Sequence, residues 1–134
     1  MATATVTLDL PDALYQRLRT IALATKQPLE KVMLHALNLG SPPAWDDVPP
    51  EFQLDIAGLD KMPDEVLWTI AKSRKTPAEF ARYEELLDRN AEGLLTPAER
   101  AELEGLRHEH DLFMLRKAHA AALLRWRGHP VVTP

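Results

Sequence analysis

The chain has 134 residues, of which 46% are hydrophobic and 27% charged, with a formal net charge of −4 and no cysteine. These values suit one or two small domains, and the lack of cysteine excludes a disulfide framework, a thiolate metal site and a thiol nucleophile. The five glycines leave no room for a glycine-rich phosphate loop. The opening residues lack the features of a signal peptide, and no stretch has the length of a membrane span, so we expect a soluble cytoplasmic protein.

The first forty residues predict one strand followed by two helices. Residues 5–10 alternate polar and apolar side chains, which is typical of a half-buried strand. Pro11 opens a helix that we expect over residues 11–24, with apolar side chains repeating at helical spacing. Pro28 starts a second helix, which Gly40 ends.

This order of elements, with a Leu-Pro step at the end of the strand, resembles the ribbon-helix-helix family of repressors and antitoxins. The resemblance covers residues 3–40 and rests mainly on the stretch 6–14, VTLDLPDAL. It implies a homodimer in which two strands pair and present their exposed face to the major groove of DNA. The residues implied to bind DNA are Thr3, Thr5, Thr7, Lys26 and Lys31, and the expected dimer core is Val6, Leu8, Leu10, Leu14, Leu18, Ile21, Val32 and Leu37.

The hydrogen-bonding and burial requirements of the strand also favour a dimer. A lone strand in so short a segment cannot satisfy its own backbone hydrogen bonds or bury enough surface. For DNA binding, the strand face offers threonines, which suit base edges, but no arginine, lysine, asparagine or glutamine. A dimerisation module whose threonines simply favour a strand therefore stays open as an alternative.

Residues 41–62 are expected to form a proline-rich, acidic linker between a domain at 1–40 and a helical region at 63–134. Residues 41–63 hold five of the eleven prolines, with five acidic residues and one basic residue. The same stretch contains several large apolar side chains, which are unusual in a solvated tether. The linker should therefore dock, either on the helices of its own chain or on a partner.

The third region predicts three helices. Residues 76–79 and 96–99 both read Thr-Pro-Ala-Glu, which is the signature of an N-cap threonine, a proline at the first helical position and a capping glutamate. We therefore expect helices over 77–92 and 97–127, and a shorter one over 62–73. The longest has about 30 residues and would span about 45 Å, so it needs a packing partner. We interpret the repeated tetrapeptide as capping and not as duplication.

No catalytic, cofactor or metal site is expected, and the chain is not expected to be an enzyme. Residues 107–111 include His108 and His110, but two positions along a helix place side chains about 200° apart, so these histidines cannot bind one ion together. We interpret this run as a solvated helix face with carboxylate and histidine pairs.

The end of the long helix is the expected protein-binding surface. It combines cations with an aromatic residue and a run of small residues, which is typical of interface hot spots. Core packing is an equal alternative for Leu123 and Leu124. The expected partner-binding residues are Arg116, Arg125, Trp126 and Arg127.

Two functions fit these features. The resemblance implies a DNA-binding, antitoxin-like regulator that binds and neutralises a partner protein, such as a toxin or nuclease-like neighbour, through its C-terminal helices and represses its own promoter. The alternative is a dimeric adaptor that does not bind DNA and presents helical arms to a protein assembly.

Overall fold

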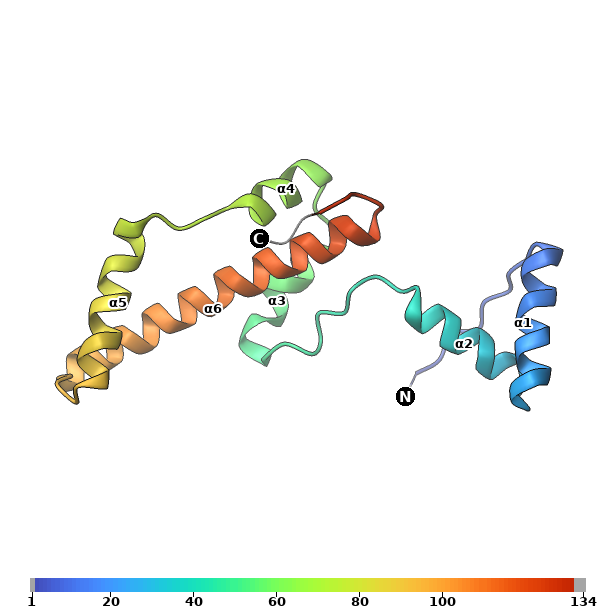
Figure 1. Ribbon diagram of the computed structural model, residues 1–134, viewed down its shortest axis with the longest axis horizontal. Coiled ribbons are helices and arrows are strands. Elements are labelled where there is room, and N and C mark those ends of the chain that lie inside the picture. The colour runs from blue at the N-terminus through green and yellow to red at the C-terminus, as the bar shows by residue number, and fades with distance from the viewer. Residues whose placement is uncertain (1, 132–134) are drawn as a thin grey trace. The chain divides into compact units, whose positions relative to one another are not determined.

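The computed structural model describes residues 2–131, and these residues form six α-helices (Figure 1). The helices fall into two compact units, unit 1 at residues 1–41 and unit 2 at residues 42–134. Unit 1 contains the first two helices, and unit 2 contains the other four. The helices are α1 (Asp12–Thr25), α2 (Leu29–Leu39), α3 (Pro50–Leu59), α4 (Asp64–Lys72), α5 (Pro77–Ala91) and α6 (Pro97–Trp126).

The predicted N-terminal strand is wrong, and so is the ribbon-helix-helix fold class. The described residues contain no strand, and residues 2–10 run without regular structure to the start of α1. A strand exists only where a second backbone accepts and donates its hydrogen bonds. Within the described chain, no backbone hydrogen bond joins residues 2–10 to another segment. Alternation in the sequence predicts which side chains share a face, but it does not supply that second backbone.

Unit 1 consists of α1 and α2, which pack against each other. Asp12 in the first turn of α1 suits the positive end of the helix dipole. At the other end, Lys26 adopts a left-handed φ of 54° and its N–H bonds to the carbonyls of Ala22 and Leu23, which closes the helix. Among the described residues of this unit, Ala22 and Val32 are the buried ones. Unit 1 therefore has a very small core.

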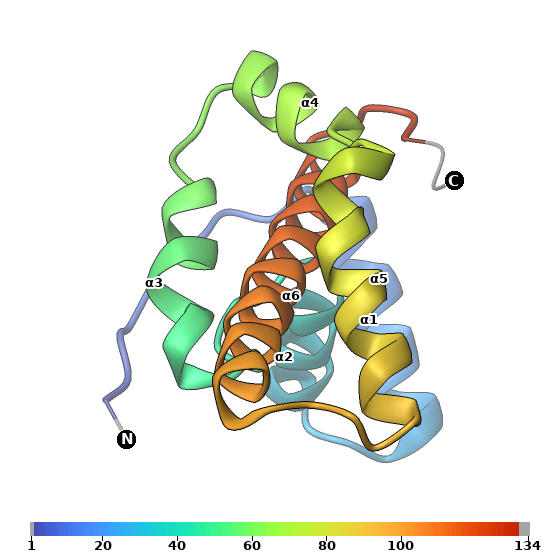
Figure 2. The ribbon, with the colours of Figure 1, turned by 90° about the vertical axis from the view of Figure 1, so that its left-hand side faces the viewer.

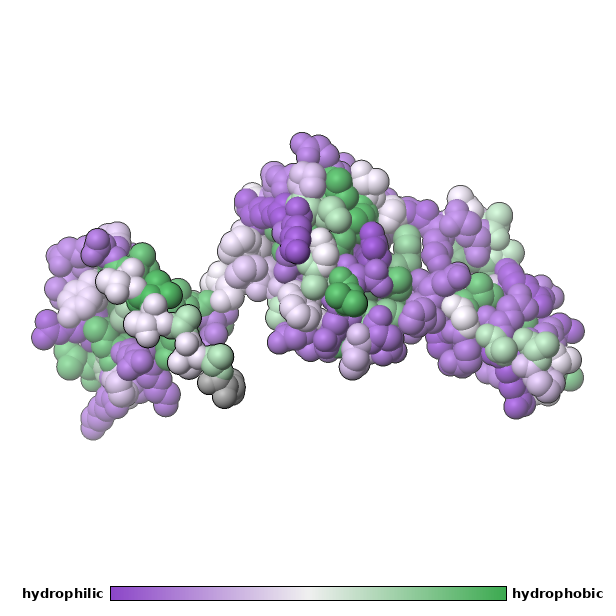
Figure 3. Space-filling view, turned by 180° about the vertical axis from the view of Figure 1, so that it is seen from behind, coloured by the Kyte–Doolittle hydropathy of each residue, from purple (hydrophilic) through white to green (hydrophobic). Residues whose placement is uncertain are grey.

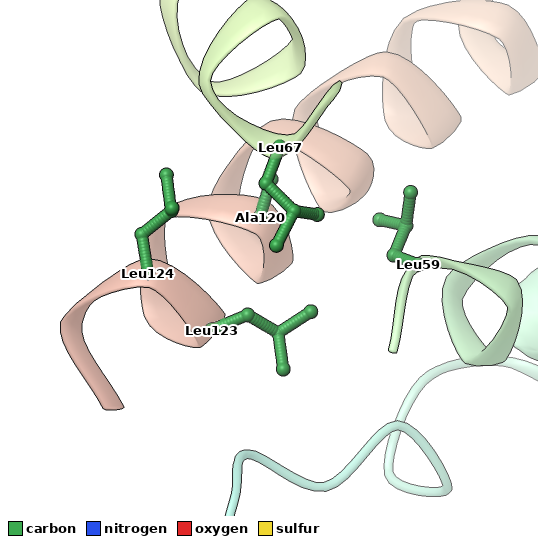
Figure 4. Close-up of a cluster of buried hydrophobic side chains, with 5 residues drawn as sticks. All are labelled: Leu59, Leu67, Ala120, Leu123 and Leu124. Carbon is green, nitrogen blue, oxygen red and sulfur yellow. The ribbon is translucent and has the colours of Figure 1, made fainter. Parts of the chain in front are cut away.

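Unit 2 is organised around α6, which packs against α3, α4 and α5 (Figure 2). Its main core lies where α4 and the end of α3 meet the C-terminal half of α6 (Figure 4). Further along, Leu86 of α5 and Leu103 of α6 are buried as well. The main core cluster consists of Leu59, Leu67, Ala120, Leu123 and Leu124.

Both predicted threonine caps are confirmed. The Oγ1 of Thr96 accepts a hydrogen bond from the N–H of Glu99 at 3.1 Å, and the Glu99 carboxylate accepts one from the N–H of Thr96, also at 3.1 Å. The Oγ1 of Thr76 accepts from the N–H of Glu79 at 3.2 Å. The long helix is also confirmed, because α6 covers 30 residues. These boundaries depend on hydrogen bonds within four residues, so the sequence contains all the information needed to place them.

The segment expected to be a linker contains a helix, α3. Pro50 occupies the first turn of α3, a position that needs no amide donor, so the proline starts the helix. Phe52, Ile56 and Leu59 are buried on α3. The ring of Phe52 stacks on His108 of α6 with the centroids 4.7 Å apart. The apolar part of this segment therefore docks on its own chain, which is the first of the two alternatives.

Candidate functional site

Unit 1 has more exposed large apolar residues than buried ones. Hydrophobic residues are visible at its surface in Figure 3. Val6 and Leu8, in the segment before α1, are 81% and 68% exposed. Exposed leucines and an isoleucine follow on both helices. We call these residues the unit 1 apolar surface: Val6, Leu8, Ile21, Leu23, Leu34, Leu37 and Leu39.

The predicted dimer core divides into three groups in the single chain. Val32 is buried, and Leu10, Leu14 and Leu18 are half-buried. The other four, Val6, Leu8, Ile21 and Leu37, belong to the unit 1 apolar surface. The sequence stripe missed Leu23, Leu34 and Leu39, because they lie off the predicted faces of their helices. Leu34 and Leu39 could have been predicted from the composition of α2, which is apolar at seven of its eleven positions.

The predicted DNA-binding residues are all exposed. Thr3, Thr5 and Thr7 lie in the irregular segment before α1. Lys26 caps the C-terminal end of α1 and Lys31 lies in the first turn of α2, so both flank the short connection between the helices. The structure therefore brings the two lysines to one end of the helix pair, but it does not form the strand face that was expected to present the threonines. DNA binding by these residues stays a prediction.

The end of α6 holds a polar cluster that joins it to the segment between α3 and α4. The guanidinium of Arg127 donates to a carboxylate oxygen of Asp64 at 2.8 Å and to the Met62 carbonyl at 2.9 Å. It also donates to the Asp60 carbonyl at 3.2 Å. The Nε2 of His129 lies 2.7 Å from the other carboxylate oxygen of Asp64. Arg127, predicted to bind a partner, therefore binds the start of α4 in the free chain.

The other predicted partner-binding residues lie along the same end of α6. Arg116 is half-buried, Arg125 is exposed, and Trp126 is 52% exposed. Leu123 and Leu124 are buried, so for them the alternative of core packing is confirmed. Binding of a partner by Arg125 and Trp126 stays a prediction.

Hydrogen bonds to the Asp64 carboxylate hold its pKa below the ordinary value near 3.8, with the bond from Arg127 as the largest cause and that from His129 next. A carboxylate whose pKa is lowered by folding stabilises the folded state above its unfolded pKa, and this stability is lost as the pH falls through the folded pKa. The cluster should therefore hold α4 in place at neutral pH and weaken below about pH 4.

We expect Asp64→Asn to lower the stability of unit 2 at neutral pH and to flatten its loss of stability between about pH 5 and about pH 2, because the variant has no carboxylate to protonate. Urea unfolding followed by tryptophan fluorescence at several pH values measures both effects. Glu65→Gln, at the next position of α4, is the matched control. Equal pH profiles for Asp64→Asn and wild type would contradict a role for the cluster.

The histidines of α6 are used in packing, which the sequence interpretation as a solvated face missed. His119 is 8% exposed, and its Nε2 lies 2.8 Å from a carboxylate oxygen of Asp60. His108 stacks on Phe52, and His110 lies beside two aromatic rings of α5. These contacts depend on helices that dock from elsewhere in the chain. In the described residues, no group of three or more histidine or carboxylate side chains is placed to hold a metal ion.

Comparison with known proteins adds no relative. No family model, no curated protein and no solved structure matches this chain. Within residues 2–131, no helix combines the length and the apolar character needed to cross a membrane. The function must therefore be argued from the surfaces of the chain itself.

A second feature of unit 2 is the hairpin arm, which we define as α5, the turn after it and the first turns of α6, residues 77–104. Arg82 of α5 donates two hydrogen bonds of 2.8 Å to the carboxylate of Glu102, and Arg89 pairs with Glu99. The bond from Arg82 lowers the pKa of Glu102, and the same bond raises the pKa of Arg82. These pairs join α5 to α6, although about 40% exposure of Arg82 and Glu102 limits what they contribute to stability.

Proposed function

We propose that this protein is a homodimeric adaptor, in which unit 1 pairs with unit 1 of a second copy and unit 2 binds another protein. The observation that carries the proposal is α2, which is apolar at seven of its eleven positions. A helix with so wide an apolar face is stable in water when other chain segments cover that face. In the described chain α1 packs on one side of α2, and Leu34, Leu37 and Leu39 stay exposed.

A second copy is the occupant that the size of unit 1 favours. Units of about 40 residues usually need disulfides, a metal or oligomerisation to be stable. The chain has no cysteine, and its described residues hold no group of metal ligands, so oligomerisation is the route that the composition supports. Burying each exposed leucine or isoleucine of the unit 1 apolar surface would contribute about 1.5–3 kcal/mol. These six side chains and Val6 together suit an interface of standard size, about 800 Å² per partner.

Unit 2 supports the other half of the proposal. Its core cluster includes Leu67, Ala120 and Leu124, which have no exposed surface, so this core is closed within a single chain. It also presents Trp126 and a long helical hairpin at its surface. Such features suit a rigid arm that contacts a protein partner.

A DNA-binding, antitoxin-like regulator with a toxin or nuclease-like partner is the second candidate. The exposure of Lys26 and Lys31 at one end of the helix pair favours it. It has less support, because residues 1–40 carry four basic and three acidic residues, which is a weak electrostatic attraction for DNA. Either function fits a cytoplasmic protein, which we propose because a chain without cysteine needs no oxidising compartment.

The test measures mass and DNA binding on the same sample. We expect light scattering to give twice the chain mass of 15.1 kDa, and fluorescence anisotropy to show no binding of labelled duplexes beyond weak, salt-sensitive association. Sequence-selective DNA binding by the wild type that is lost in the double variant Lys26→Ala, Lys31→Ala would favour the DNA-binding regulator over the adaptor. A folded single chain would contradict both functions.

A further inference from the structure

The charges of unit 1 are separated along the chain. Residues 2–16 carry two carboxylates, Asp9 and Asp12, and no arginine or lysine. Residues 17–41 carry one acidic residue and four basic residues, which are Arg17, Arg19, Lys26 and Lys31. The first part of unit 1 therefore has a net charge of −2, and the second part has a net charge of +3.

These charges are not paired within the single chain. Among the described residues of unit 1, no arginine, lysine, aspartate or glutamate side chain makes an ion pair or a hydrogen bond, and all seven of these side chains are exposed. Asp12 and Lys26 lie at opposite ends of α1, whose 14 residues span about 20 Å, so the chain cannot pair them itself. Opposite charges are therefore present in unit 1 and are free to pair with a second molecule.

A groove of unit 1 lies beside the two carboxylates. It has a volume of about 430 Å³ and combines apolar side chains with a phenol and both carboxylates: its lining residues are Leu8, Leu10, Met33, Tyr15, Asp9 and Asp12. Leu8 also belongs to the unit 1 apolar surface, so the groove adjoins the surface that the proposed dimer covers. No arginine or lysine lines the groove. It therefore offers apolar contacts together with unpaired negative charge.

A lysine side chain of a second copy matches this lining. The four-carbon stem of lysine packs on apolar side chains while its ammonium group binds a carboxylate. Lys26 and Lys31 are exposed and flank the connection between α1 and α2. A two-fold axis that crosses α1 runs the α1 helices of two copies antiparallel, which brings Asp12 of one copy near Lys26 of the other. The same contact then forms twice, because a two-fold interface is self-complementary.

We propose that two unit 1 apolar surfaces pair antiparallel, with Lys26 and Lys31 of each copy in the groove of the other copy, beside Asp9 and Asp12. The inference rests on the proposed function, and it adds the orientation of the two copies and the residues that make the pairing selective. Apolar contacts alone accept many apolar surfaces, whereas complementary charges at both ends favour one orientation and disfavour other partners. The same contacts occupy the two lysines that DNA binding would need.

The test exchanges the charges of the proposed contact in the whole chain. The first variant carries Asp9→Lys and Asp12→Lys, and the second carries Lys26→Glu and Lys31→Glu. Each variant alone places like charges at both contacts of its own dimer. A 1:1 mixture of the two variants restores opposite charges at both contacts of a mixed dimer. Sedimentation velocity at low and high salt measures the dissociation constants of wild type, of each variant and of the mixture.

We expect each variant alone to dimerise at least about tenfold more weakly than wild type at low salt, because like charges meet at both contacts. The mixture should regain the affinity of the wild type, and all differences should shrink at high salt. Recovery in the mixture also shows that both variants are folded. The control is Asp46→Lys with Asp47→Lys, at exposed positions outside unit 1, which changes the net charge as much as the first variant and should dimerise like wild type.

Three results would overturn the proposal while the homodimer of the proposed function stands. The first is equal dimerisation of wild type and both variants. The second is weakening of both variants without recovery in the mixture. The third is equal weakening of the control and the first variant, because net charge alone would then govern the pairing. A wild type that stays a single chain of 15.1 kDa would overturn this proposal and the proposed function together.

Discussion

Leu124→Ala should lower the free energy of unfolding of unit 2 by about 2–5 kcal/mol, which is the usual cost of truncating a fully buried leucine. Leu124 has no exposed surface, and it packs in the core cluster with Leu67 and Ala120 (Figure 4). The alanine leaves a cavity between α4 and α6, which pack against each other in the main core of unit 2. The neighbouring backbones are helical and cannot easily collapse into that space.

Urea unfolding followed by tryptophan fluorescence measures this loss. The matched control is Leu54→Ala on α3, because Leu54 is 90% exposed and its truncation should change the stability by less than about 0.5 kcal/mol. A similar loss in both variants would show that the core cluster does not stabilise unit 2 as the structure indicates.

Leu37→Asp should weaken the proposed dimer by at least about 100-fold, because an aspartate at the interface would be buried without a partner or would keep the interface hydrated. Leu37 is 62% exposed on α2 in the single chain, so the change should not disturb the packing of α1 on α2. Sedimentation velocity over a range of concentrations measures the dissociation constant. Leu54→Asp, in unit 2, is the control and should leave the dimer intact. Equal association of all three proteins would place the interface elsewhere.

The helices of unit 2 were largely predictable, because their signals are local. The threonine caps at Thr76 and Thr96 and the prolines that follow them define where α5 and α6 start, and these contacts span three residues. The helix α3 was not predicted, because the prolines around it indicated a linker. Pro50 has the opposite effect, since a proline in the first turn starts a helix.

The strand and the histidine contacts show what a sequence pattern leaves undetermined. The alternation at residues 5–10 predicts a strand only if a second backbone lies beside it, and the described chain provides none. His119 and Asp60 are 59 positions apart in the sequence, and they meet because α6 docks beside the end of α3. Nothing in the local sequence of either residue indicates that contact.

At the end of α6, the local sequence also fails to indicate which contacts the side chains make. Its composition predicted an interface, and the cations and tryptophan do lie near the protein surface. The structure uses Arg127 within the chain, where it binds Asp64 and two backbone carbonyls. Composition alone cannot distinguish an arginine that binds a partner from one that binds its own chain, because both need the same donors and the same partial burial.

The central claim is that the unit 1 apolar surface is covered by a second copy, and energy transfer between copies tests it most directly. The chain has no cysteine, so Gln16→Cys, at an exposed position of α1, provides a single site for a donor or an acceptor dye. Mixing donor-labelled and acceptor-labelled full-length chains should produce energy transfer that an excess of unlabelled wild type removes and that Leu37→Asp prevents. The absence of transfer at micromolar concentration, with a mass of 15.1 kDa and an intact helical circular dichroism spectrum, would contradict the claim.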